Sequence, residues 1–161
     1  MPKPEKTNVM RVLDKLKLPY KDYCYVEAGL LSGVEVAEYL HQDPTIVYKT
    51  LVTVGKSKNY LVFMVPVAEE LDLKKAAAAA GEKAIEMIKS KELLPLTGYI
   101  HGGCSPIGMK KQFRTFIHQT AVGQEKILFS AGKIGYQVEM TLNDLQKAVP
   151  VQPIDLIVDP A

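Results

Sequence analysis

The sequence predicts one domain of mixed α+β class that spans residues 1–161. Its 161 residues, 47% of them hydrophobic, are enough to build one core of ordinary size. The expected helices and strands are interspersed, but they do not follow the regular βαβ alternation of a doubly wound sheet. No internal repeat, long linker or block of like charge divides the chain, so a single domain is the simplest interpretation.

The expected helices begin at capping residues. Thr7 can cap the first helix, whose apolar residues recur at helical spacing until Pro19. Ser32 and Glu35 form a capping-box pattern at the start of the second. The other expected helical segments are an alanine-rich stretch at 72–80 that ends at Gly81, a turn or two within 82–89, and a helix from Thr141 to Pro150.

The expected strands are rich in β-branched and aromatic residues. Two of them, at 48–54 and 60–67, are separated by the polar turn 55–59 and predict a hairpin. Three shorter strands are expected later in the chain, at 115–117, 126–130 and 136–140.

Charge and cysteine content exclude several classes of protein. A net charge of +2 does not provide the basic surface of a non-specific DNA-binding protein. Cys24 and Cys104 are too far apart in the sequence for a CxxC redox or zinc pair and argue against a disulfide framework. No apolar run approaches the ~20 residues of a membrane span, and the first residues show no signal-peptide pattern. We therefore expect a cytoplasmic protein that binds neither a membrane nor DNA.

The segment at 97–111, here called the glycine loop, is the most unusual part of the sequence. Four glycines and one proline within 98–108 favour an irregular loop whose backbone can approach a ligand closely. Amide N–H groups in such a loop can bind a carbonyl or stabilise an oxyanion, which suits ester chemistry. The spacing is not that of a phosphate-binding or dinucleotide-binding loop, and a structural turn is the alternative interpretation.

Two other segments could carry chemistry. Lys49 stands between Tyr48 and Thr50 on an expected strand, where its ammonium could meet an ester carbonyl or a tRNA phosphate. A solvated lysine at a strand edge is the alternative. The small residues at 129–135 follow another expected strand, and by themselves they are compatible with an ordinary hairpin turn.

The order and spacing of these segments resemble the YbaK and prolyl-tRNA-synthetase-associated editing domains. The resemblance covers roughly residues 7 to 157. It rests on Lys49-Thr50, the Leu-Asp-Leu-Lys-Lys segment at 71–75, the Thr-Gly-Tyr…Gly-Gly-Cys-Ser-Pro-Ile-Gly pattern of the glycine loop, and Ser130-Ala131-Gly132-Lys133.

The resemblance implies a compact mixed sheet, partly barrel-like and flanked by helices. It implies a trans-editing aminoacyl-tRNA deacylase that acts on mischarged aminoacyl-tRNA, most closely a Cys-tRNA(Pro)/Cys-tRNA(Cys) deacylase, with prolyl-tRNA synthetase as a partner. This sequence has Ser32 where the family has a pocket phenylalanine, and Ala131 where it has a glycine. The resemblance assigns catalysis to Lys49, Gly102 and Gly103, and substrate binding to Tyr25, Ser32, Thr50, Ser105, Ser130 and Gly132.

No nucleophile triad, metal or cofactor is expected. His41, His101 and His118 are not spaced like metal ligands, and a structural Cys104 is favoured over a Cys104–His101 catalytic pair. The attacking group would be a bound water or, for a cysteinyl substrate, its own thiol, which would make the reaction formally lyase-like.

Two other classes of function remain open at this stage. The chain could be a non-catalytic module that binds the tRNA acceptor end or a synthetase, or a regulatory protein that shares only the fold. Four basic residues could contact tRNA phosphates, although solvated surface charge is the common alternative. They are Lys110, Lys111, Arg114 and Lys133.

Overall fold

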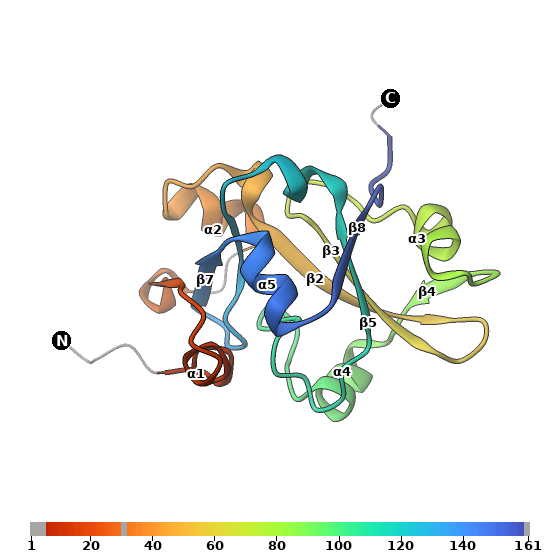
Figure 1. The fold of residues 1–161 in the computed structure, drawn as a ribbon, viewed down its shortest axis with the longest axis horizontal. Helices are drawn as coiled ribbons and strands as arrows, with labels where there is room; N and C mark the ends of the chain where they lie inside the picture. Colours follow the sequence, from red (N-terminus) through yellow and green to blue (C-terminus); the bar gives the residue numbers. More distant parts are fainter. Residues whose placement is uncertain (1–5, 30–31, 160–161) are drawn as a thin grey trace.

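The computed structural model describes residues 6–29 and 32–159, and in this part of the chain two β-sheets are flanked by five α-helices (Figure 1). The α+β class is therefore confirmed. One sheet has three strands in the order β1-β7-β6, and the other has five in the order β4-β2-β3-β5-β8. An isolated parallel bridge between Val47 and Leu128 connects them, and the sheets are not closed into a barrel.

Side-chain caps start the first two α-helices as expected. The Thr7 hydroxyl accepts a hydrogen bond from the N–H of Met10 at 3.2 Å, and Ser32 and Glu35 form a complete capping box. The α-helices are α1 (Asn8–Lys15), α2 (Gly33–Tyr39), α3 (Leu73–Ala80), α4 (Ser90–Thr97) and α5 (Leu142–Ala148). Short 3₁₀ helices are η1 (Val26–Ala28), η2 (Pro44–Ile46) and η3 (Gln119–Gly123). None of the helices that the structure describes is long and apolar enough to cross a membrane.

The five-stranded sheet is built around the expected hairpin. Strands β2 (Tyr48–Gly55) and β3 (Tyr60–Pro66) pair antiparallel, and β5 (Arg114–His118) and β8 (Val151–Ile154) extend the sheet in parallel. On the other side of β2 lies β4 (Ile85–Met87). The helical turn predicted within 82–89 is therefore wrong, because pairing with the edge of β2 overrides the helical composition of this segment.

The three-stranded sheet joins distant parts of the chain. Strand β1 (Lys21–Cys24) pairs antiparallel with β7 (Tyr136–Met140), which also pairs with β6 (Ile127–Ser130). Besides β4 and the short 3₁₀ helices, the sequence did not predict β1, β8 and α4.

Two apolar clusters lie on opposite faces of the five-stranded sheet. The larger one lies between the sheets and includes Val52 and Met64 from one sheet and Phe129 from the other. The second lies under α3 and includes Phe63 and Phe116. Since side chains alternate along a strand, neighbouring residues of β2 face different clusters.

The C-terminal segment, residues 155–159, is tied to α3. The Lys75 ammonium donates to Asp155 at 2.9 Å, to the Ile157 carbonyl at 2.7 Å and to Asp159 at 2.8 Å. The N–H of Asp72 donates to the Leu156 carbonyl at 2.7 Å, while the Asp72 carboxylate caps α3. The Leu-Asp-Leu-Lys-Lys segment thus has a structural role in this fold.

Candidate active site

The glycine loop is held in shape by the side chain of Tyr99. Helix α4 ends at Gly98, whose positive φ of 86° turns the chain into the loop. The buried Tyr99 hydroxyl donates to the carbonyl of Ile107 at 2.5 Å and accepts from the Asn8 side chain at 3.1 Å. These bonds connect the loop to α1, and the sequence-based interpretation missed both Tyr99 and Asn8.

The glycine loop packs directly on a second turn, residues 130–135, here called the serine turn. A Cβ atom added to Gly103 would lie 2.9 Å from the backbone nitrogen of Ile134 and 3.2 Å from the carbonyl carbon of Lys133. A Cβ at Gly132 would lie 2.8 Å from the ring of Tyr99. The two segments therefore approach each other at a distance that only glycine permits.

Hydrogen bonds stabilise the conformation of the serine turn and connect the turn to Tyr25. The Ser130 hydroxyl accepts from the N–H of Gly132 at 3.1 Å. The N–H of Tyr25 donates to the Gly135 carbonyl at 2.7 Å, and burial raises the pKa of the Tyr25 phenol. The structure thus brings five of the predicted residues together in one contiguous arrangement: Tyr25, Gly102, Gly103, Ser130 and Gly132.

Lys49 lies on the other sheet, on a strand that is bridged to the segment carrying Ser130. Strands β2 and β6 run in the same direction from the Val47–Leu128 bridge, so Lys49 and Ser130 each lie two residues beyond it on neighbouring segments. Lys49 is half-buried, and its ammonium makes no hydrogen bond or ion pair with any residue in the described ranges. A cation held in this way is available to a ligand.

Ser32 lies at the start of α2, near the beginning of β2. A Cβ at Gly33 would lie 2.5 Å from the Val67 side chain, and the N–H of Val67 donates to the Val47 carbonyl at 2.9 Å. The exposed Ser32 side chain is used in the capping box. Its position is compatible with the predicted contact, but its hydroxyl already has a structural function.

Thr50 and Ser105 are placed differently from the other predicted residues. Strand alternation directs Thr50 to the face opposite Lys49, and its buried hydroxyl oxygen has no hydrogen-bond partner among the described residues. Ser105 is 0% exposed, and its hydroxyl accepts from the N–H of Ile107 at 3.4 Å. Direct contact between Ser105 and a substrate would therefore require the glycine loop to open.

The amide groups of the glycine loop differ in availability. The N–H of Gly103 donates to the Ile100 carbonyl at 2.9 Å, so it supports the loop itself. Gly102 is exposed, has a positive φ of 87°, and its N–H has no acceptor within residues 6–29 and 32–159. Of the two predicted glycines, Gly102 is therefore the better placed to bind a carbonyl oxygen.

The thiol and imidazole groups do not form a nucleophile pair. Burial raises the pKa of the Cys104 thiol to about 12, so this thiol is neutral near pH 7. His101 is exposed, whereas buried His118 accepts a hydrogen bond from the N–H of Leu156 at 3.1 Å. Within the described residues no group of three or more His, Cys, Asp or Glu side chains could hold a metal ion.

Comparisons with known proteins identify relatives that match most of the chain. The sequence model of a family described as the aminoacyl-tRNA editing domain matches residues 29–148. EbsC of Enterococcus faecalis (strain ATCC 700802 / V583), provisionally named a Cys-tRNA(Pro)/Cys-tRNA(Cys) deacylase, is 47% identical over 137 residues, which cover 84% of each chain.

Two solved structures share the fold. The hypothetical protein APE2540 superposes with a TM-score of 0.85 at 17% identity, over 94% of this chain and 99% of its own. A provisionally named trans-editing enzyme for prolyl-tRNA synthetase gives a TM-score of 0.81 at 22% identity, over 97% of this chain and 100% of its own. At these identities the likeness concerns the fold alone.

Proposed function

Because this chain belongs to the aminoacyl-tRNA editing domain family, we propose that it is an enzyme that cleaves the ester bond of mischarged aminoacyl-tRNA. Cysteine on tRNA(Pro) or tRNA(Cys) is the proposed substrate, in line with the name of the relative that is 47% identical. The observation that carries the proposal is the Lys49 ammonium, which has no partner among the described residues, on a strand bridged to the segment that leads to Ser130 and the turn on which the glycine loop packs.

In the proposed site, the reacting ester lies between Lys49 and the glycine loop. The N–H of Gly102 donates to the ester carbonyl oxygen, which gains negative charge as the tetrahedral intermediate forms. The Lys49 ammonium stabilises the same charge or holds the terminal phosphate. Ser130 contacts the substrate from the serine turn, and Tyr25 borders the site. Gly103 allows the loop and the turn to meet.

Two routes of attack are compatible with this arrangement. In the first, a water oxygen attacks the carbonyl carbon, the bond from that carbon to the ribose oxygen breaks, and the ribose oxygen takes up a proton. In the second, the thiol sulfur of a cysteinyl substrate bonds to the carbonyl carbon, the bond from that carbon to the ribose oxygen breaks, and the thiol proton passes to the ribose oxygen. The amino acid leaves as a cyclic thioester. Cys104 takes part in neither route, because its thiol stays protonated and buried.

Substrate choice would be divided between this chain and a partner. Ser32, in place of the family's phenylalanine, would leave more room beside the amino-acid side chain. A prolyl-tRNA synthetase could select the tRNA, since a net charge of +2 gives this chain little general affinity for nucleic acid. The proposed reaction belongs in the cytoplasm, where aminoacyl-tRNA is made and used.

The test is deacylation of Cys-tRNA(Pro), Ala-tRNA(Pro) and Pro-tRNA(Pro) by the purified protein, beside Lys49→Ala and the control Lys56→Ala. Lys56 is an exposed lysine of the β2–β3 turn. We expect the wild type and Lys56→Ala to clear a mischarged tRNA and spare Pro-tRNA(Pro), whereas Lys49→Ala loses the activity. If the wild type binds these tRNAs but clears none of them, the non-catalytic binding module replaces this proposal.

A further inference from the structure

The face of the three-stranded sheet that carries Ser130 also carries Gln137. Gln137 of β7 pairs directly with Ser130 of β6 on one side and with Tyr23 of β1 on the other. Paired residues of neighbouring strands point to the same face of a sheet. The neighbours of Gln137 along β7, Tyr136 and Val138, face the apolar cluster between the two sheets, so Gln137 and Ser130 share the opposite face.

Lys49 belongs to the same row of side chains. Val47 and Leu128, the two residues of the bridge between the sheets, pack together against α2 in one small apolar cluster. Lys49 and Ser130 each follow these residues by two positions, so their side chains point to the face on which α2 lies. One row therefore runs from β2 through β6 to β7 and consists of Lys49, Ser130 and Gln137.

Gln42, which follows α2, fixes the carboxamide of Gln137. The side-chain N–H of Gln42 donates to the Oε1 atom of Gln137 at 2.7 Å. The Nε2 atom of Gln137 donates to no residue that the structure describes. A Gln137 carboxamide turned by 180° would place its own N–H group against that of Gln42. The bond from Gln42 therefore determines that the donor end of Gln137 is the available one.

The donor end of Gln137 opens outward. Gln137 as a whole is only 3% exposed. Among the described residues, the fully buried side-chain atoms without a hydrogen-bond partner are Gln42 Oε1 and Thr50 Oγ1. The Gln137 nitrogen lacks a partner and is not one of them, so the small exposed part of Gln137 includes its N–H groups. Because an amide donor in so enclosed a position is costly unless it is satisfied, these N–H groups are suited to a ligand.

The two ends of the row correspond to the two halves of the proposed substrate. Ser32, the predicted contact of the amino-acid side chain, lies on the β3 side of Lys49, because its neighbour Gly33 packs against Val67. Gln137 lies on the opposite side of Lys49, toward β1. With the ester at Lys49 and the amino acid toward Ser32, the nucleoside that carries the ester extends toward Gln137.

We propose that Gln137 binds the terminal nucleoside of the aminoacyl-tRNA and that Gln42 is its positioning residue. A Gln137 N–H donates to an acceptor of this nucleoside, which is a ring nitrogen of the base or the 2′-hydroxyl oxygen of the ribose. This inference rests on the proposed function for the identity of the ligand, but it concerns binding of the nucleoside and not the chemical step.

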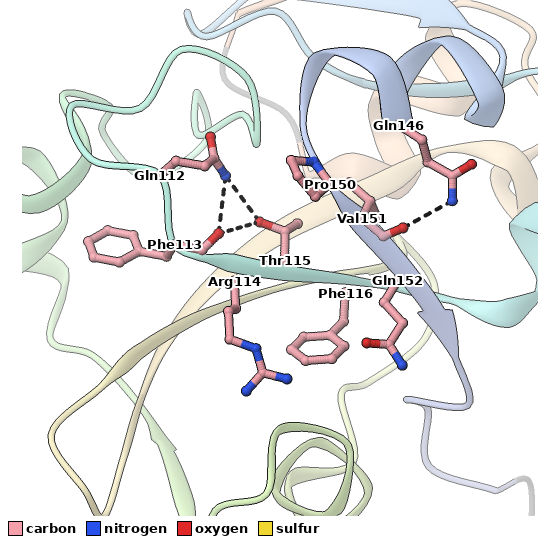
Figure 2. Close-up of a pocket in the computed structure, with 9 residues that line it drawn as sticks. All are labelled: Gln112, Phe113, Arg114, Thr115, Phe116, Gln146, Pro150, Val151 and Gln152. Atoms are coloured by element: carbon pink, nitrogen blue, oxygen red, sulfur yellow. Dashed lines mark hydrogen bonds between the residues drawn. The ribbon is translucent and has the colours of Figure 1, made fainter.

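The test is the affinity of the protein for the uncharged trinucleotide CCA, the 3′ end of tRNA, measured by NMR titration. This RNA contains the terminal nucleoside and has no acyl group. The variants are Gln137→Met, Gln42→Met and Gln137→Glu, which keeps an acceptor for Gln42 but has no N–H. The control is Gln146→Met, since exposed Gln146 donates to the Val151 carbonyl at 3.0 Å at the β8 edge of the five-stranded sheet, outside the row (Figure 2).

Both Gln137 variants should weaken CCA binding about threefold to tenfold, the range for one net hydrogen bond. Gln42→Met should cause a smaller loss, because it frees the Gln137 carboxamide to rotate, and Gln146→Met should bind as the wild type does. With cysteinyl-adenosine as substrate, Gln137→Met should raise KM by the same factor as the CCA dissociation constant and leave kcat unchanged, as expected for a contact equally strong in the ground state and the transition state. Gln42→Met should raise KM alone in the same way.

A CCA analogue that ends in 2′-deoxyadenosine identifies the acceptor. If Gln137→Met still weakens its binding, the acceptor is the base; if wild type and variant bind it equally, the acceptor is the ribose hydroxyl.

The inference is overturned if the wild type does not bind CCA or if Gln137→Met binds it as Gln146→Met does. Wild-type affinity in Gln137→Glu would also overturn it, because holding Gln42 would then be the whole role of Gln137. A lower kcat with unchanged CCA affinity would assign Gln137 to the acyl end, against the proposal. If the Gln137 variants weaken CCA binding while the wild type deacylates nothing, the nucleoside contact is supported and the proposed enzymatic function fails.

Discussion

Replacing Gly103 by alanine should separate the glycine loop from the serine turn. The new Cβ would lie 2.9 Å from the Ile134 nitrogen, 3.2 Å from the Lys133 carbonyl carbon and 3.3 Å from its Cα. All three are backbone atoms, which cannot rotate away as the end of a flexible side chain can. Ordinary contacts of a methyl group begin at about 3.5 Å, so the two segments must move apart by roughly half an ångström.

Overpacking of this kind costs about 1–3 kcal/mol of unfolding free energy, out of the 5–15 kcal/mol of a typical domain. Gly103→Ala should therefore remain folded at room temperature, with a urea midpoint below that of the wild type. Its kcat/KM for deacylation should fall at least tenfold, because a displacement of this size misplaces Gly102 relative to Lys49.

Gly123→Ala is the matched control, since no atom lies within 4 Å of the added Cβ and the residue needs no positive φ. It should leave activity unchanged and leave stability equal or slightly higher. If Gly103→Ala is as stable and as active as Gly123→Ala, the close packing of loop on turn does not position the site.

Three other perturbations test separate parts of the structure. Lys75 binds the C-terminal segment at three points, so Lys75→Met should lower the free energy of unfolding measured in urea. It should also expose that segment to carboxypeptidase without changing the rate of deacylation. Unchanged proteolysis would contradict this role of Lys75. Iodoacetamide near neutral pH should label exposed Cys24 and leave buried Cys104 unlabelled, which mass spectrometry can measure. The Cys104→Ala variant should keep its deacylation activity. Rapid labelling of Cys104 in the native protein would contradict a thiol pKa of about 12. Burial holds the pKa of folded His118 below the unfolded value of about 6.5, so protonation favours the unfolded chain and stability should fall as the pH drops below about 6.5. His118→Asn, which keeps an acceptor for the Leu156 N–H, should flatten that dependence in urea titrations, and an equal dependence in both proteins would assign it to other groups.

The parts of the fold that the sequence predicted correctly depend on local interactions. Thr7, Ser32 and Asp72 cap helices through bonds to residues two or three positions away, which a sequence pattern can reveal. Strands β1 and β8 escaped prediction because they are short edge strands without a continuous apolar pattern. Helix α4 was missed because it contains Pro95, and β4 because its pairing partner is distant in the chain.

The sequence predicted which residues belong to the candidate site, but it did not predict how they are arranged in space. The resemblance assigned Lys49 and Ser130, but their proximity depends on a bridge between two sheets that no local pattern indicates. Nor could the sequence reveal that Thr50 faces the core and that Ser105 lies beneath the loop surface, since both follow from long-range packing. Their roles as substrate contacts remain predictions.

The pairing of β1 with β7 has a consequence for synthesis of the protein. Strand β1 is synthesised before its partner β7, so it stays unpaired until the long stretch of chain between the two strands has been made. A long apolar strand in that position would invite pairing with other nascent chains. β1 has only four residues and begins with the charged pair Lys21-Asp22. These charges favour a solvated strand until the serine turn and β7 have been synthesised. Lys49 and Ser130 can come together only after the serine turn has been made, so a nascent chain that stops before this turn cannot form the proposed site.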